Sequence, residues 1–385
     1  MVESIYPLMR GQTILRALAT EIAFWDIGRY PAGDAIDWWA KIPKLVGMGS
    51  IGILIPIRSS MRLLPAHVQT MRPWLELASE IVVVDSGSTD GGVAFLERAM
   101  PGARVVQNPP GLYQSWNAGI RQIGAQYTYI STVGDGITRA GLLHLQDVAE
   151  RHDADVVISP PAFVDAGGQP AANNDWPVHD LIDALAITDE VRFEGLVLFL
   201  VAMSYIPFAI LGSSASNLYR TTTLRRCPFP TEFGRNGDGA WGLLNALGIR
   251  LVLTPRRESN FRLHPPTHLP SEYASPGGDQ RMFDAAIALL GNYLENDPAA
   301  RECAGELRLE RLVEAKRTVL QWRGALQTYR ERKMPWILDP RAWRARRYRQ
   351  SSQKRCVQLL HEMLRASPRP EAAAPTPIRL PRQMV

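Results

Sequence analysis

The sequence predicts an α/β fold, with a doubly wound, mostly parallel central sheet, flanking helices and a helical C-terminal extension. The segments 51–57 and 81–84 are apolar runs without polar alternation, which are typical of strands buried on both faces of a parallel sheet. Helical patterns alternate with further short strands downstream, as in right-handed β-α-β units. Residues 301–385 hold 20 Lys and Arg against 8 Asp and Glu, a net charge of +12 in a chain of net +5. The sequence therefore separates a basic extension from an acidic body.

The expected elements follow one another along the chain. After the strand at 51–57, a helical pattern runs through Trp74, Leu75 and Leu77 toward Ala78. The next expected elements are a strand at 81–85, a helix at 93–99, a strand at 103–106, a helix at 116–123, strands at 127–133 and 153–159, a hairpin at 163–168 and a strand at 214–220.

Two carboxylates are expected at one edge of this sheet. Asp85 ends the second strand, and Asp135 follows the fourth strand between Gly134 and Gly136. Because the carboxyl ends of parallel strands meet at one edge, both side chains are expected to face one ligand-binding cleft. A diphosphate sits poorly beside carboxylates without a cation, so the pair indicates a metal-bridged phosphate. A simple turn between two glycines is the alternative role of Asp135.

Six segments, in order, resemble the inverting nucleotide-sugar glycosyltransferases of family 2, which have the GT-A fold. These segments are Ile-Leu-Ile-Pro at 53–56, Val-Val-Asp-Ser-Gly-Ser-Thr-Asp-Gly at 83–91, Asn-Ala-Gly-Ile at 117–120, Gly-Asp-Gly at 134–136, Asn-Gly-Asp-Gly-Ala-Trp at 236–241 and Asn-Phe-Arg-Leu-His-Pro at 260–265. The resemblance covers about residues 50–270. The sequence departs from the family in having one acid, Asp135, in the metal motif, and Gly237 in place of an acidic neighbour of Asp238.

The resemblance implies a role for each matching residue. Asp238 is the expected catalytic base, and Asp135 the expected ligand of Mn²⁺ or Mg²⁺. His264 is expected to complete the metal shell or to contact phosphate, and Arg262 to add positive charge at the diphosphate. The donor nucleotide is expected to contact Pro56, Arg58, Asp85, Ser86, Gly87 and Asn117. A uridine donor is favoured, because a carboxylate such as that of Asp85 can accept the imino proton of uracil; guanosine and thymidine donors stay open.

The expected activity is transfer of a sugar, with inversion, from a nucleotide-sugar donor to a saccharide or lipid-linked acceptor. Such a displacement needs a base for the acceptor hydroxyl and stabilisation of the departing diphosphate. A sugar nucleotidyltransferase and a binding protein that has lost turnover are the alternatives. Asp238 in a surface turn, and His264 held structurally by the prolines after it, are the alternative roles of those two residues.

Four segments are expected along the chain: a helical extension at 1–48, a glycosyltransferase domain at 49–270, a basic helical extension at 271–366 and a disordered tail at 367–385. The domain divides into a nucleotide-binding half at 49–140 and an acceptor half at 141–270. Within it, the apolar segment 196–212 is interrupted by polar residues, so a buried or interface-lying helix is expected, and a membrane span is the alternative.

Partners and location are predicted from the basic extension and the cysteines. Arginines and aromatic residues together suit an anionic membrane surface, and a solvated helix or a nucleic-acid contact is the alternative. Nucleic acid is not the expected partner. Three scattered cysteines are typical of a reducing compartment. The sequence thus predicts a cytoplasmic protein, peripheral at the inner face of the cell membrane.

Overall fold

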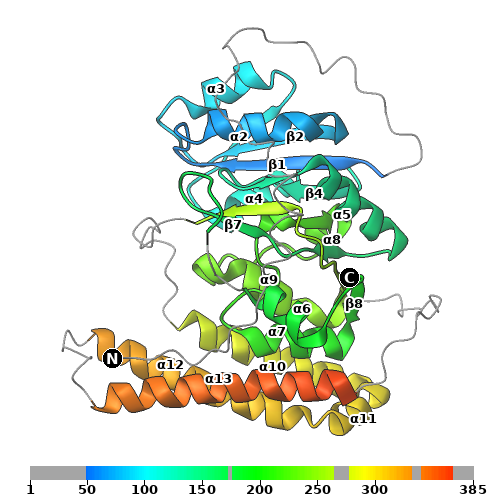
Figure 1. Cartoon of the computed structure of the whole chain (residues 1–385), viewed down its shortest axis with the longest axis vertical. Coiled ribbons are helices and arrows are strands. Elements are labelled where there is room, and N and C mark those ends of the chain that lie inside the picture. Colours follow the sequence, from blue (N-terminus) through cyan, green and yellow to red (C-terminus); the bar gives the residue numbers. More distant parts are fainter. Residues whose placement is uncertain (1–48, 172–175, 264–276, 332–339, 367–385) are drawn as a thin grey trace, which may run out of the picture. The chain divides into compact units, whose positions relative to one another are not determined.

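The computed structural model describes residues 49–171, 176–263, 277–331 and 340–366. An eight-stranded sheet has the strand order β3-β2-β1-β4-β9-β6-β10-β8 (Figure 1). At its centre, β1 (Ile51–Ile57) pairs in parallel with both β2 (Ala78–Asp85) and β4 (Tyr127–Ile130). In this sheet, β9 and β8 run antiparallel to their neighbours. The predicted mostly parallel α/β sheet is confirmed.

The other strands of this sheet are β3 (Arg104–Gln107), β6 (Val156–Ile158), β8 (Val191–Glu194), β9 (Asn217–Arg220) and β10 (Arg250–Leu253). A small second sheet has the order β5-β11-β7, formed by β5 (Gly136–Ile137), β11 (Ser259–Arg262) and β7 (Ala162–Val164). The helices of the body are α2 (Leu64–Met71), α3 (Gly92–Ala99), α4 (Leu112–Ile120), α5 (Arg139–Arg151), α6 (Pro177–Leu185), α7 (Gly195–Tyr205), α8 (Thr221–Arg226) and α9 (Gly237–Leu244).

The β-branched runs form the expected strands, because their side chains are buried on both faces of the sheet. Several boundaries differ from the prediction; α4, for example, spans Leu112–Ile120 rather than 116–123. The helical pattern through Trp74 is a 3₁₀ helix, Arg72–Leu77, and Ala78 already begins β2. The segment predicted as a hairpin at 163–168 turns back on itself, because an antiparallel bridge joins Val164 to Pro170, and its first arm, β7, also pairs in parallel with β11.

Helix α7 accounts for the apolar segment at 196–212. Nearly all of its side chains are buried, so the prediction of a buried helix is confirmed up to Tyr205. Beyond the cap residue Ile206, Pro207 follows, and proline ends a helix because it lacks the N–H donor. Eleven residues span about 17 Å, against about 30 Å for the hydrocarbon core of a bilayer. Among the described residues, no helix has the length and apolarity needed to cross a membrane.

Four helices follow the body: α10 (Gly278–Asn296), α11 (Pro298–Glu306), α12 (Leu309–Glu331) and α13 (Pro340–Ala366). The C-terminal helix pair, α12 and α13, packs together and against α7. Lys316 of α12 is fully buried there, and its Nζ donates to the carbonyl oxygens of Ser204 at 2.7 Å and Ile206 at 2.8 Å. One hydrophobic cluster includes residues of the body and of the helix pair. The expected extension at 1–48 and the tail at 367–385 lie outside the described residues.

Candidate active site

The carboxyl ends of the central parallel strands bring the first predicted residues together. Asp85 is the last residue of β2, in register with Ile57 of β1, and its side chain is buried. Its Oδ1 accepts a hydrogen bond of 3.0 Å from the Ser88 N–H, which closes the turn after the strand. Gly87 has a φ of +81°, a conformation that side-chain-bearing residues rarely adopt. Asp85 therefore stands at the carboxyl end of β2, with one carboxylate oxygen held by the turn that follows the strand.

The loops after β1 and β2 are joined to each other. The Ser59 N–H donates to Ser88 Oγ at 2.8 Å. Pro56 lies in β1, and Arg58 lies in the exposed segment directly after it. Both predicted residues are thus at the same edge as Asp85, with Arg58 toward solvent.

Helix α4 contacts the predicted donor side through one serine. Ser86, directly after β2, is buried, and its hydroxyl lies 2.6 Å from that of Ser115 in α4. Ser115 Oγ also lies 2.7 Å from the carbonyl of Gly111, before the helix. The end of β2 and the start of α4 therefore form one hydrogen-bonded unit.

The Asn117 amide holds a remote loop. Its Nδ2 donates to the Phe229 carbonyl at 2.8 Å, and its Oδ1 accepts from the Phe229 N–H at 2.9 Å. Both ends of the amide are used, so the structure places Asn117 as a clamp on the segment that leads to α9. Its predicted contact with the nucleotide stays a prediction.

Asp135 lies in a buried pocket next to Arg262. Its Oδ1 accepts a 2.9 Å hydrogen bond from the Arg262 N–H, and its Oδ2 is 3.5 Å from the Ser213 hydroxyl. Burial raises the pKa of the Asp135 carboxyl to about 7, against the lowering effect of these contacts. The Arg262 guanidinium donates to the carbonyls of Gly134 at 3.3 Å and Ala166 at 2.6 Å. The two residues predicted for metal and diphosphate are thus neighbours.

Around Asp135, the described residues offer a divalent cation a single carboxylate ligand, that of Asp135 itself. Burial penalises the negative charge of the Asp135 carboxylate, and a bound cation would compensate that charge. No group of three or more His, Cys, Asp or Glu side chains suited to a metal occurs in the described part of the chain. The other predicted ligand, His264, lies outside the described residues. A cation at Asp135 would accordingly take most of its ligands from the donor and from water.

Asp238 lies in the first turn of α9, half-buried, with its Oδ1 accepting from the Gly239 N–H at 2.7 Å. Desolvation raises the pKa of the Asp238 carboxyl, whereas a hydrogen bond to Tyr113 of α4 acts in the opposite direction. Gly237 is needed for this contact, since a Cβ there would lie 2.4 Å from the Tyr113 ring. The glycine that replaces an acid of the family motif thus makes room for Tyr113.

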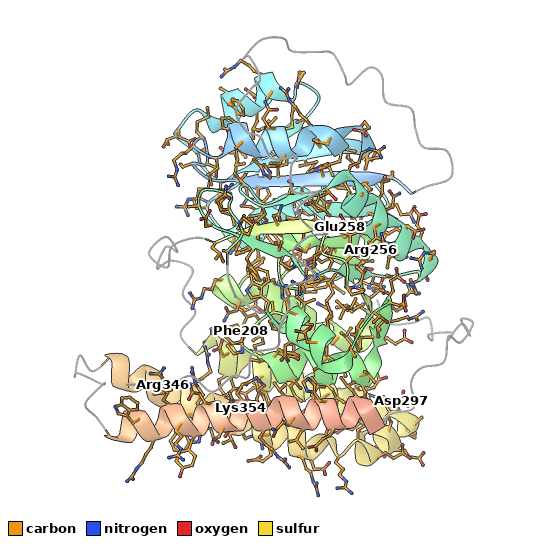
Figure 2. The ribbon with its side chains drawn as sticks, viewed as in Figure 1. Phe208, Arg256, Glu258, Asp297, Arg346 and Lys354 are labelled. Atoms are coloured by element: carbon orange, nitrogen blue, oxygen red, sulfur yellow. The ribbon has the colours of Figure 1, made fainter. Side chains whose placement is uncertain are left out.

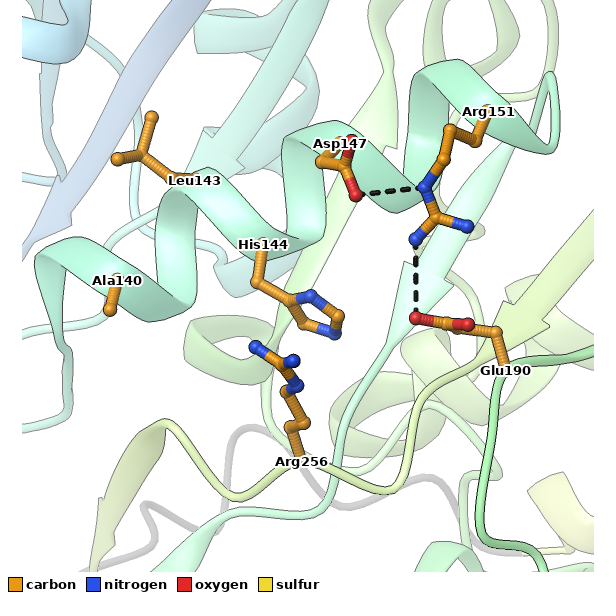
Figure 3. Close-up of a pocket in the computed structure, with 7 residues that line it drawn as sticks. All are labelled: Ala140, Leu143, His144, Asp147, Arg151, Glu190 and Arg256. Carbon is orange, nitrogen blue, oxygen red and sulfur yellow. Dashed lines mark hydrogen bonds and ion pairs between the residues drawn. The ribbon is translucent and has the colours of Figure 1, made fainter.

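Two hollows of the described surface lie beside α4 and α5. A cavity of about 160 Å³ adjoins Tyr113 and is lined by residues 110–114 together with Thr231 and Gly234. A larger one, of about 470 Å³, is lined by Ala140, Leu143, His144, Asp147, Arg151, Glu190 and Arg256 (Figure 3). In it, Arg151 pairs with Asp147 at 2.8 Å and Glu190 at 3.2 Å. None of the predicted site residues lines this larger hollow.

The sequence profile of the family described as Glycosyl transferase family 2 matches residues 53–201. The chain carries a family 2 glycosyltransferase domain. The match includes the segments of Asp85, Asn117 and Asp135, and it ends within α7. The predicted family and the predicted enzyme class, a glycosyltransferase, are confirmed.

Solved structures similar to this glycosyltransferase include S. aureus TarS 1–349 in complex with UDP-GlcNAc, with 13% identity, a TM-score of 0.45 and coverage of 82% of this chain and 91% of that one. The same TarS fragment in complex with UDP has 14% identity, a TM-score of 0.42 and the same coverage. A mycobacterial protein has 16% identity and a TM-score of 0.41, over 63% of this chain and 75% of that one. Among curated protein sequences, none matches the glycosyltransferase.

Sequence reasoning missed Tyr113 and the pairing of Asn117 with Phe229. Tyr113 and Asn117 are four residues apart on α4 and therefore share one helical face. The spacing of Tyr113 and Asn117 can be read from the sequence and predicts that both side chains lie on one face of the helix. Their partners, more than 100 residues away, are not readable from it.

Proposed function

We propose that this glycosyltransferase moves a sugar from a UDP-sugar, with inversion, to a saccharide or lipid-linked acceptor. The observation that carries the proposal is Asp238, a half-buried carboxylate in the first turn of α9. Burial raises its pKa, which makes the carboxylate a stronger base. Asp85 and Asp135 supply the other acids at the carboxyl edge of the sheet.

In the proposed reaction, Asp238 takes the proton of the acceptor hydroxyl as that oxygen attacks the anomeric carbon. The bond from that carbon to the diphosphate oxygen breaks, and its electron pair leaves with the nucleoside diphosphate. Attack from the face opposite the leaving group inverts the anomeric centre. This geometry requires the base and the diphosphate on opposite sides of the sugar.

The donor is proposed to lie along the edge formed by Pro56, Asp85, Ser86 and Gly87, with the uracil imino group donating to Asp85. Arg58 is proposed to face a phosphate, and Asn117 to hold the adjacent loop in place.

The diphosphate is proposed to lie between Asp135 and Arg262. Mn²⁺ or Mg²⁺, bound by Asp135 with His264 as a second candidate ligand, would neutralise the diphosphate. Arg262 adds a fixed positive charge, since backbone carbonyls already hold its guanidinium in place.

The donor proposal is tested by calorimetric titration of the full chain with UDP, GDP and dTDP, each with Mn²⁺ and with EDTA. The expected result is binding of UDP that weakens in EDTA. Transfer is then followed as UDP release from UDP-N-acetylglucosamine and UDP-glucose, with a membrane extract as the source of acceptors. Asp238→Asn is expected to lower the rate at least about a hundredfold while leaving UDP affinity unchanged.

The outcomes separate the alternatives. UDP binding without release in any assay would indicate a binding protein that has lost turnover. Release of diphosphate from UTP and a sugar 1-phosphate would indicate a nucleotidyltransferase. A normal transfer rate in Asp238→Asn would remove the proposed base.

The same enzyme is proposed to work at the cytoplasmic face of a membrane through helix α13. From 340 to 361 this helix has seven Lys or Arg and no Asp or Glu. Its side chains Ala345 and Leu360 are buried, whereas Trp343 and Tyr348 are 57% and 53% exposed. Arg346 and Lys354 project from α13 (Figure 2). A cationic surface with exposed aromatic rings suits anionic lipid headgroups.

Vesicle flotation tests the membrane proposal, with phosphatidylcholine vesicles that contain or lack phosphatidylglycerol. Binding to the anionic vesicles alone is expected, and Arg346→Glu together with Lys354→Glu should abolish it. The matched control is Arg311→Glu, an exposed position on α12. Equal binding by both variants would refute a membrane-facing role for α13.

A further inference from the structure

Two aromatic rings and Gly237 pack against the ring of Tyr113. It stacks on Phe229 at 5.6 Å with 20° between the planes, and it meets Trp116 edge-on at 5.2 Å. Gly237, directly before Asp238, lies so close that a Cβ would come within 2.5 Å of two ring carbons. The Asn117 clamp on Phe229 fixes the stacking partner as well. The hydroxyl of Tyr113 therefore has a defined position.

That hydroxyl lies between two acceptors. It donates to the carbonyl oxygen of Arg235 at 3.1 Å, and the Asp238 carboxyl group lies near enough to interact with it electrostatically. A phenol has one hydrogen to donate and lone pairs that can accept. The hydroxyl can therefore donate to one of these oxygens at a time. Which oxygen accepts depends on whether the Asp238 carboxyl group is protonated.

We propose that Tyr113 is the positioning residue of the base, because its hydroxyl can pair with the Asp238 carboxyl group both before and after that group takes a proton. While Asp238 is ionised, Tyr113 donates to it. Once Asp238 holds the proton of the acceptor, the carboxyl group donates to the Tyr113 oxygen, and the tyrosine hydrogen turns to the Arg235 carbonyl. In both states the Asp238 carboxyl group has Tyr113 as a partner, so the cycle avoids the cost of leaving that group without a hydrogen bond.

The other titratable side chain that faces Asp238 within the described residues is Tyr219 of β9, whose own hydroxyl accepts from Asn217 at 3.0 Å. Burial raises the pKa of both tyrosines, so they stay protonated near neutral pH. Tyr113 is thus the side chain placed to respond to the charge of Asp238.

The test is Tyr113→Phe, which keeps the ring and removes the hydroxyl. Carbon NMR of the full chain labelled at the Asp carboxyl carbon, with Asp238 assigned from Asp238→Asn, gives the titration midpoint of Asp238 directly. Loss of a hydrogen bond to the ionised form is expected to raise this midpoint by about one pH unit. The acid limb of the UDP-release profile should move to higher pH by the same amount.

The matched control is Tyr205→Phe, which removes a tyrosine hydroxyl that donates to Asp180 at 2.5 Å and not to a group of α9. It should leave the Asp238 midpoint unchanged. An unchanged midpoint in Tyr113→Phe, with the fold intact by circular dichroism, would overturn the inference.

The inference rests on Asp238 being the base, and the two can fail separately. If Asp238→Asn transfers at the normal rate while Tyr113→Phe still shifts the midpoint, the proposed function fails and the coupling stands. If Asp238→Asn is inactive and the midpoint does not move, the coupling alone fails.

Discussion

Lys316 provides a sharp test of how the C-terminal helix pair is attached to the catalytic body. Its ammonium is fully buried, and it donates to the Ser204 and Ile206 carbonyls at the end of α7 and to Gln353 at 3.1 Å. Desolvation lowers the pKa of Lys316 from 10.5 to about 8. We consider Lys316→Met, which keeps the length and the apolar stem of the side chain and removes the charge.

The expected magnitude follows from this pKa difference. At pH 7.5 this lowering of the pKa corresponds to a net cost of about 3 kcal/mol for the charged side chain in the folded protein relative to water. Between about pH 8 and 10.5 the unfolded chain keeps the proton that the folded protein releases, so this cost disappears as the pH rises. From pH 7.5 to 9.5 the wild type should gain about 2 kcal/mol of unfolding free energy relative to Lys316→Met.

Urea unfolding, followed by circular dichroism at both pH values, measures the difference in unfolding free energy between the wild type and Lys316→Met. Groups that titrate equally in both proteins cancel in this difference. The cancellation is better in a Cys356→Ala background, because the Cys356 thiol interacts with Lys316. Lys354→Met, an exposed lysine on α13, is the control and should show no pH-dependent difference. A difference between wild type and Lys316→Met that stays constant from pH 7.5 to 9.5 would refute a buried, titrating lysine.

Three further changes probe the site. Asn117→Ala leaves both backbone groups of Phe229 without their partner and should lower the free energy of unfolding by about 2–3 kcal/mol, measured by urea titration; a change below about 0.5 kcal/mol would contradict the clamp. Gly237→Ala places a methyl group against Tyr113 and should reduce UDP release at least about tenfold while UDP affinity in calorimetry stays the same; Gly248→Ala, with open space around it, is the control. Asp135→Asn should remove the difference in UDP affinity between Mn²⁺ and EDTA, and a persisting difference would place the cation elsewhere.

Much of the central sheet could be predicted because its signals are local. The apolar runs ending at Ile57 and Asp85 have no polar alternation, and the structure buries them between neighbouring strands. The antiparallel direction of β9 depends on its pairing with β4 and β6, and no pattern within Ser214–Ser216 or Asn217–Arg220 encodes it. Direction within a sheet is a property of tertiary contacts, so the strand was predictable and its orientation was not.

Part of the candidate site could be predicted for the same reason. Asp85 ends one predicted strand and Asp135 follows another, and these strands, β2 and β4, are the two parallel neighbours of β1. The environment of Asp238 could not be predicted, because Tyr113 reaches it from a helix more than 100 residues earlier. In the sequence, Gly237 stands where the family motif has an acidic residue. In the structure, the absence of a side chain at Gly237 leaves room for the Tyr113 ring.

The burial of α7 beneath the C-terminal helix pair has a consequence for biosynthesis. Helix α7 ends at Tyr205, but the helices that pack on it are complete only at Ala366. At about 5–20 residues per second, a ribosome needs roughly 10–30 seconds to make the intervening chain. During that interval, the face of α7 destined for α12 and α13 is exposed and able to aggregate. The nascent protein is therefore expected to need a chaperone late in its synthesis, and ribosomes stalled before residue 309 should carry chains that bind one.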